Sequence, residues 1–164
     1  MHVSDELKLT VGKALGRIPS GVFILTAERD GQPLAMMASW VQQVAFVPPS
    51  VSVAIAKERP AHAALSKPGS TFGLSVVPEG DTSLMKKYAR GIQDGANPFE
   101  GVQIARAASG TIYLPDALAY LDCRVSKLLD FGGDHDLFIA DVVAGKALKD
   151  GSSFTHLRGN GFHY

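Results

Sequence analysis

Residues 36–59 read MMASWVQQVAFVPPSVSVAIAKER. A short polar segment at 39–43 is flanked by apolar residues on both sides. A Pro-Pro pair then precedes residues 51–55, whose period-two alternation predicts a strand. That strand ends in a cationic tip at 57–60, where a short helix is expected to begin. The start of a helix offers unpaired N–H groups and a partial positive charge, which suit a phosphate. The stretch therefore predicts a site for a flat, phosphorylated ring, with the ring against the polar segment and the phosphate against the tip.

Short β-rich runs at hairpin spacing make up most of the remaining chain. Residues 21–27 and 34–39 flank Asp30-Gly31, a pair typical of a tight hairpin. Further strands are expected at 71–77, 111–114, 117–129 and 137–144, short helices at 61–66 and 82–90, and a polar tail at the end. Because helices are few and no βαβ rhythm occurs, we expect a mainly β fold: an antiparallel barrel of Greek-key type with flanking helices, not a Rossmann sheet.

The chain length of 164 residues suits one domain, residues 1–164, with room for a core. Ser4 is an acceptable helix start, and residues 1–18 are expected to form an N-terminal helix that packs on the barrel. The apolar stripe predicted to make that contact is Leu7, Val11, Ala14, Leu15 and Ile18.

Charge and composition exclude several classes of function. Basic and acidic residues balance, with 16 of each, which argues against an electrostatic nucleic-acid binder. No apolar run approaches the thickness of a bilayer, and acids stand near the N-terminus where a signal peptide would have bases, so a cytoplasmic protein without membrane contact is expected. The single cysteine, Cys123, lies in an alternating apolar strand and is expected to be a buried, inert thiol.

The polar segment and the cationic tip each have an ordinary structural explanation as well. Trp40 offers a flat surface, and Gln42 and Gln43 offer donors and acceptors for ring carbonyls, but an ordinary polar loop explains these residues equally well. Lys57 and Arg59 are explained either as the charges of a solvated strand end or as a phosphate clamp beside a helix start.

Two histidines are further candidates. His62 falls in the first turn of the expected helix and could touch the same phosphate, although a lone surface histidine is more common. His135 lies between Asp134 and Asp136, in what could be a simple hairpin turn, and the flanking negative charge favours a protonated imidazole. Because successive strand residues point to opposite faces, these three side chains converge poorly on a metal ion.

Known nucleotide and nucleophile motifs do not occur in the sequence. It contains no G-x-G-x-x-G, Walker-type, G-x-S-x-G, H-E-x-x-H or C-x-x-C pattern. This absence is compatible with hydride transfer, because in such reactions the cofactor carries the chemistry and the protein binds and orients it.

Four strings in order resemble the flavin reductase family of FMN-binding split barrels: ASWVQQVAFVPPSVSVAIAKER at 38–59, AYLDC at 119–123, GDH at 133–135 and HLRGNG at 156–161. Within that family the chain is most similar to the module at the C-terminus of some diflavin flavoproteins. Many members carry Ser or Thr where this chain has Trp40 and Gln42, so it follows the diflavin variant.

The resemblance implies an NAD(P)H-dependent flavin reductase that binds FMN, with FAD as an option, and accepts hydride from NADH or NADPH at the flavin N5. It implies that His135 lies near the flavin and the nicotinamide. The positions that it implies for cofactor binding are Ser39, Trp40, Val41, Gln42, Gln43, Ala45, Lys57, Arg59, His62 and Arg158.

It further implies a homodimer, with free flavin, a partner oxygenase or another molecule as electron acceptor. Three alternatives stay open: an electron-transfer flavoprotein whose prosthetic FMN is reduced by a protein partner, a non-catalytic flavin-binding module, and a split-barrel oxidase acting on a vitamin phosphate.

Overall fold

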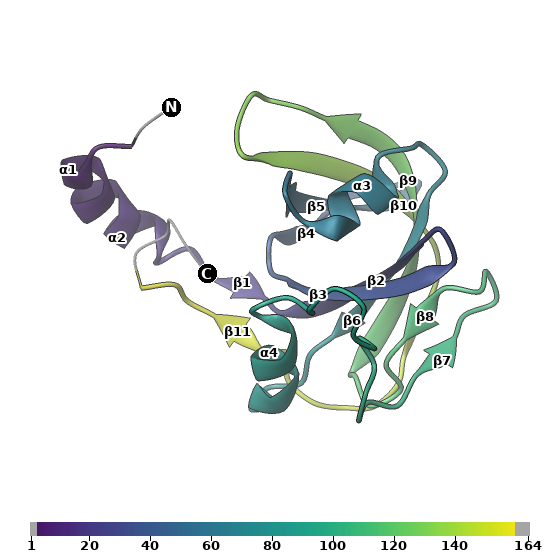
Figure 1. The fold of residues 1–164 in the computed structure, drawn as a ribbon. Helices are drawn as coiled ribbons and strands as arrows, with labels where there is room; N and C mark the ends of the chain where they lie inside the picture. Colours follow the sequence, from purple (N-terminus) through teal and green to yellow (C-terminus); the bar gives the residue numbers. More distant parts are fainter. Residues whose placement is uncertain (1–2, 160–164) are drawn as a thin grey trace.

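The computed structural model describes residues 3–159 and shows a curled antiparallel sheet with short helices at its margins (Figure 1). The strands are β1 (Ser20–Gly21), β2 (Phe23–Arg29), β3 (Gln32–Ala38), β4 (Val41–Phe46), β5 (Pro49–Ala56), β6 (Thr71–Val76), β7 (Ala105–Arg106), β8 (Ile112–Tyr113), β9 (Ala119–Leu129), β10 (His135–Ala147) and β11 (Thr155–His156). The helices are α1 (Asp5–Leu7), the π-helical η1 (Lys8–Gly12), α2 (Lys13–Leu15), α3 (Pro60–Leu65) and α4 (Thr82–Tyr88). The predicted mainly β, antiparallel fold is confirmed.

The main sheet places two consecutive strands at its opposite edges. Its order is β3-β2-β6-β9-β10-β5-β4, and each neighbouring pair is antiparallel. Only Ser39 and Trp40 join β3 to β4, which is possible because the sheet curls until its edges approach each other. The backbone N–H of Ala54 on β5 donates to the Trp40 carbonyl at 3.0 Å. Trp40 therefore lies at the seam where the barrel stays open.

Two hydrophobic clusters form the core of the protein. The first lies inside the curled sheet and includes Phe72 and Phe138, both fully buried. The second packs α4 on the barrel, where Tyr88 donates from its hydroxyl to the Pro98 carbonyl at 2.8 Å. Cys123 is fully buried, as expected, and burial raises the pKa of its thiol to about 12.

The predicted polar bend is shorter than expected. Residues 39–43 do not form one bend: the chain turns at Ser39 and Trp40 alone, and β4 begins directly afterwards, paired with β5. Gln42 and Gln43 are compatible with this strand because it is an edge strand and both side chains are exposed. Their polarity suggested a loop, whereas their position is the exposed edge of a sheet.

The C-terminal segment is also more ordered than the expected polar tail. Its strand β11 pairs with β1, with His156 opposite Ser20 and Thr155 opposite Gly21. Strands of two residues, such as β7 and β11, contain no alternation that a sequence pattern could detect.

Most of the N-terminal helix extends away from the sheet (Figure 1), whereas its end meets the C-terminal segment, where the Arg158 carbonyl passes close to Gly16. The expected packing of this helix on the barrel stays a prediction. The apolar side chains of the helix are exposed: Leu7 by 46%, Leu9 by 65%, Val11 by 38%, Leu15 by 42% and Ile18 by 61%. The amphipathic pattern correctly predicted a helix, but it could not specify what covers the stripe. None of the helices in residues 3–159 has the length and apolar character needed to cross a membrane.

Candidate functional site

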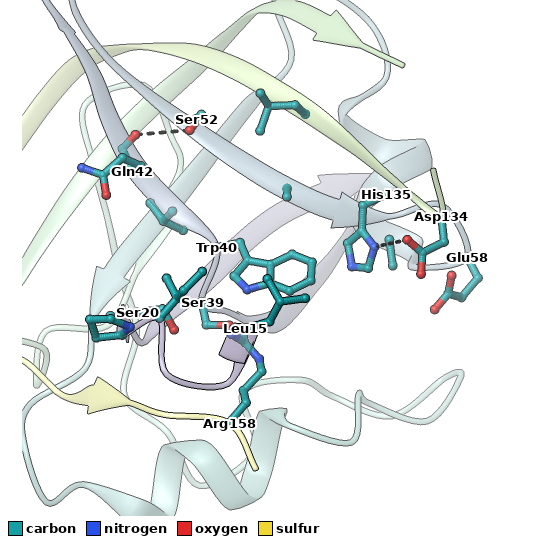
Figure 2. Close-up of a pocket in the computed structure, with 17 residues that line it drawn as sticks. Leu15, Ser20, Ser39, Trp40, Gln42, Ser52, Glu58, Asp134, His135 and Arg158 are labelled. Carbon is teal, nitrogen blue, oxygen red and sulfur yellow. Dashed lines mark hydrogen bonds and ion pairs between the residues drawn. The ribbon is translucent and has the colours of Figure 1, made fainter. Parts of the chain in front are cut away.

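A cavity of about 840 Å³ opens around Trp40 at the seam of the barrel (Figure 2). Segments far apart in the sequence form its walls: the end of the N-terminal helix, the β3–β4 link, one face of β5, the start of β10 and the C-terminal segment. Small-molecule sites typically enclose about 300–1,000 Å³. The cavity is therefore large enough for a ligand of cofactor size.

Strand β5 separates this cavity from the core, because its side chains alternate in size. Those that face the core are large, and Val53 and Ile55 are 0% and 1% exposed. Those that line the cavity are Ser52, Ala54 and Ala56. Small side chains at alternate positions leave a flat floor on which a planar ring can lie.

Trp40 is held between an imidazole and a guanidinium. Its ring centroid lies 4.8 Å from that of His135, with the planes tilted by 51°, and 4.9 Å from the guanidinium carbon of Arg158. Arg158 also donates from Nη2 to the hydroxyl of Ser39, which is buried. The indole is 40% exposed, so part of it stays accessible to a ligand. An aromatic surface, a cation and a hydroxyl thus converge at the β3–β4 link.

His135 is the first residue of β10 and pairs with Ala56 of β5, at the edge of the flat floor. Its Nδ1 lies 2.9 Å from Oδ1 of Asp134. This hydrogen bond holds the pKa of the Asp134 carboxyl below its ordinary value, so the carboxylate stays ionised. An ionised carboxylate can only accept a hydrogen bond, so Nδ1 carries the proton of this bond.

The C-terminal segment brings Arg158 to the cavity. Pairing of β11 with β1 places His156 opposite Ser20, and the backbone of Arg158 then passes so close to Gly16 that a side chain there would collide with its carbonyl. Burial, with a smaller contribution from the charge of Arg158, lowers the pKa of His156. The lasting positive charge of this segment is therefore that of Arg158.

A buried hydroxyl in the cavity wall has no hydrogen-bond partner. Within residues 3–159, no group bonds to Oγ of Ser20. A buried polar atom in this state costs free energy, which a ligand atom at hydrogen-bond distance would recover. Together with the flat floor, the indole and the guanidinium, this hydroxyl suits a planar ligand that carries an anionic group.

The structure brings about half of the predicted site residues together. Those that line the cavity are Ser39, Trp40, Val41, Gln42, Arg158 and the predicted catalytic residue His135. Gln43 and Ala45 do not line it: Gln43 is exposed, and its amide nitrogen donates to the Ala45 carbonyl at 3.4 Å.

Lys57 does not reach the cavity. It follows β5 in a turn and is not among the residues that line the cavity. Its Nζ lies 3.0 Å from Oδ1 of Asp130 and 3.3 Å from Oδ1 of Asp136. The hydrogen bond that Lys57 donates to Asp130 is the main reason that the pKa of Lys57 is raised. The lysine therefore belongs to an ion-pair network outside the cavity.

The two other members of the expected phosphate clamp are also elsewhere. Nε2 of His62 lies 2.7 Å from Oδ2 of Asp136, and its ring packs edge-on against Phe138 at 5.3 Å. Arg59 is the N-cap of α3, and its guanidinium lies beside Gly91. The start of α3 therefore does not contribute to the cavity wall as the sequence analysis expected.

Several residues of the cavity were not anticipated. The small side chains at 52, 54 and 56 were detectable, because they alternate with Val, Val and Ile in the printed sequence. No comparable signal marks Ser20, Glu58 or Leu137, whose contribution depends on how distant segments meet.

Comparisons with known proteins agree with this geometry. A family model described as the flavin reductase like domain matches residues 15–160. A diflavin flavoprotein (A 3) of Nostoc sp. is 40% identical over 161 residues, which cover 97% of this chain and 28% of that protein. Diflavin flavoprotein A 1 of Synechocystis sp. is 39% identical over 154 residues, covering 93% of this chain and 26% of that protein. The chain thus spans less than a third of the length of these relatives.

Solved structures share the fold at lower identity. The NADH:FAD oxidoreductase SgcE6 of Streptomyces globisporus superposes with a TM-score of 0.84 at 23% identity, covering 96% of this chain and 92% of that one. BorF, the flavin reductase component of a bacterial two-component tryptophan halogenase, has a TM-score of 0.78 at 23% identity, covering 93% and 94%. These matches confirm the expected split barrel. Since the family model covers nearly the whole sequence, this chain belongs to the flavin reductase-like domain family.

Proposed function

We propose that this chain is a flavin reductase that binds FMN beside Trp40 and uses NADH or NADPH as hydride donor. The observation that carries the proposal is the meeting of a flat floor, an indole and a guanidinium in one cavity of about 840 Å³. The ring would lie on the floor of β5. The phosphate would lie near Arg158 and the unsatisfied hydroxyl of Ser20, which favours FMN over FAD in this proposal.

Each residue of the site would have a simple task. A bound flavin supplies the redox chemistry, so the protein needs no activated nucleophile. The small side chains of β5 would orient the ring, and Trp40 would exclude water from its side of the cavity. His135, the catalytic residue in this proposal, donates a hydrogen bond from Nδ1 to Asp134. The imidazole would lie near the polar edge of the ring, where a hydrogen-bond donor stabilises negative charge.

The proposal includes a cytoplasmic homodimer that passes electrons to free flavin or to a partner oxygenase. Its support is exposed apolar surface, on the N-terminal helix and at the tip of the β4–β5 hairpin, where Phe46 is 85% and Val47 93% exposed. Size-exclusion chromatography with light scattering at micromolar concentration tests the dimer, and a monomer would contradict it.

The activity has a direct test. The protein is purified without added flavin, FMN is then added, and oxidation of NADH and of NADPH is followed by absorbance. We expect FMN binding and flavin-dependent oxidation of at least one nucleotide. His135→Gln should keep FMN binding and lose turnover, because it preserves the size of the side chain and removes the titratable proton. Absence of both binding and oxidation would reject the proposal.

One observation favours a second candidate, an electron-transfer flavoprotein. The matched relatives are more than three times as long as this chain, which covers 28% and 26% of them, so another domain could reduce the flavin in such an arrangement. In that case FMN should copurify without exchanging, and oxidation of NADH and NADPH should be negligible.

A further inference from the structure

Lys57 contacts the chain on both sides of His135. The turn between β9 and β10 leads directly into His135, and the backbone N–H of Lys57 donates to the Asp134 carbonyl of this turn at 2.9 Å. The Lys57 amine lies 3.0 Å from Oδ1 of Asp130, where the turn begins, and 3.3 Å from Oδ1 of Asp136, which follows His135. One residue at the end of β5 thus holds both ends of the segment that carries the imidazole.

The contact with Asp136 matters because that carboxyl group is buried, with its side chain 6% exposed. Its Oδ2 lies 2.7 Å from Nε2 of His62, whereas its Oδ1 has no hydrogen-bond partner within residues 3–159. The amine of Lys57 is the ion-pair partner of Oδ1. Removal of this cation would leave a buried carboxylate oxygen uncompensated, which favours movement of Asp136 toward water.

Movement of Asp136 would change the position of His135, because successive residues of a strand point to opposite faces. His135 and Leu137 line the cavity, and Asp136 between them does not. In the register of the sheet, His135 lies opposite Ala56 of the floor and Asp136 opposite Ile55 of the core face. The anchor of Asp136 on one face therefore determines where the imidazole lies on the other.

Lys57 also acts on the group that accepts a hydrogen bond from the imidazole. Nδ1 of His135 donates to the carboxylate of Asp134 (Figure 2). This hydrogen bond is the main reason that the pKa of the Asp134 carboxyl is lowered, and the charge of Lys57 adds a smaller contribution. The contacts of Lys57 and its charge thus favour the same orientation of the imidazole.

We propose that Lys57 is a positioning residue, which holds His135 over the floor of the cavity from outside the cavity. The part of Lys57 in turnover rests on the proposed function, in which His135 is the catalytic residue. Its effect on the position of the imidazole does not. Displacement of a reacting group by about 1 Å can cost about 100-fold in rate. Lys57 should therefore affect turnover and not the affinity for FMN.

The position of the imidazole can be measured without turnover, by nuclear Overhauser contacts in the flavin-free protein. The rings of His135 and Trp40 have centroids 4.8 Å apart, so their protons should give a contact in the wild type. Lys57→Met should weaken this contact about threefold for a displacement of about 1 Å. Lys57→Arg keeps the positive charge and should restore most of it.

Steady-state oxidation of NADH and NADPH at saturating FMN measures the consequence for turnover. Lys57→Met should lower kcat about tenfold and leave the FMN dissociation constant nearly unchanged. Lys57→Arg should recover most of the rate. Such a split between kcat and FMN affinity is not expected from a general loss of stability.

Lys87→Met is the matched control, because it makes the same side-chain change on α4. Lys87 does not line the cavity, and its amine donates to the Glu100 carbonyl at 2.8 Å. Both the Overhauser contact and kcat should stay as in the wild type.

Asp130→Asn decides the matter if Lys57→Met does not fold. Asp130 is mostly exposed, and an asparagine oxygen can still accept the hydrogen bond that the Gly132 N–H donates to Oδ1 at 2.7 Å. This variant removes only the ion pair with Lys57, so it should weaken the Overhauser contact and lower kcat by less than Lys57→Met does.

The outcomes separate this inference from the proposed function. An unchanged Overhauser contact in the folded variant would overturn the inference, as would a weakened contact with unchanged kcat or an equal loss of kcat and FMN affinity. Oxidation of neither nucleotide by the wild type would reject the proposed function alone, and the Overhauser contact would still decide whether Lys57 positions His135.

Discussion

The two faces of β5 have the same backbone and opposite tasks. One face presents Val53 and Ile55 to the core. The other presents Ala54 and Ala56 to the cavity. A shift of one residue exchanges the two sets. The alternation of side chains along β5 therefore determines which residues a ligand meets on the floor of the cavity.

Ile55→Ala should have the largest effect, and it tests the core face alone. The side chain is 1% exposed, and removal of a buried isoleucine costs about 2–5 kcal/mol of unfolding free energy. Urea denaturation measures the loss, and FMN titration of the folded variant should give nearly the wild-type affinity. If Ile55→Ala weakened FMN binding without lowering stability, the core face of β5 would also contribute to FMN binding.

Ala54→Phe tests the opposite face and should do the reverse. A phenyl group on the floor would occupy the space of the ring, so we expect a loss of FMN affinity of about 100-fold, or about 2.7 kcal/mol. Because the side chain extends into an open cavity, the urea midpoint should change little. Ala54→Ser is the control and should bind FMN normally. Normal binding by Ala54→Phe would place the ring elsewhere.

Arg158→Met and Lys57→Met compare a cation inside the cavity with one outside it. Loss of a charge-assisted contact to phosphate should weaken FMN binding by Arg158→Met about tenfold, with little change for riboflavin, which has no phosphate. Lys57→Met should leave both affinities unchanged, since its amine contacts Asp130 and Asp136. Selective loss of FMN by Lys57→Met would restore the phosphate clamp expected from the sequence.

The smallest effect concerns the segment that carries Arg158. The pKa of His156 is lowered from 6.5, mainly by burial, so the unfolded chain binds a proton more readily than the folded one. Stability should therefore fall as the pH decreases through 6.5 toward the lower pKa of the folded state. In His156→Gln, the urea midpoints measured above and below this pH range should be nearly equal. If the stability of that variant depends on pH as steeply as that of the wild type, another group causes the effect.

Local signals in the sequence predicted much of the fold. Asp30-Gly31 marked the β2–β3 hairpin, and α4 lies within the expected helix at 82–90, with Asp81 as its N-cap. Period-two alternation identified β5 and β9. These features depend on residues close together in the chain, which is why a pattern could reveal them.

The candidate site was predicted only in part, because it depends on contacts between distant segments. Trp40 and His135 were identified through the family resemblance, and they do lie together. The sequence did not reveal that Lys57 contacts Asp130 and Asp136, because both acids lie more than 70 positions away in the chain. Arg158 reaches the cavity through a pairing of two residues with β1, which no local pattern could indicate.

Trp40 is the only tryptophan in the sequence, and it lies within the cavity. Its ultraviolet emission therefore originates from a single known position, without background from a second indole. A yellow ligand placed against it would quench that emission, so occupancy could be followed in the unlabelled protein, in real time and at low concentration.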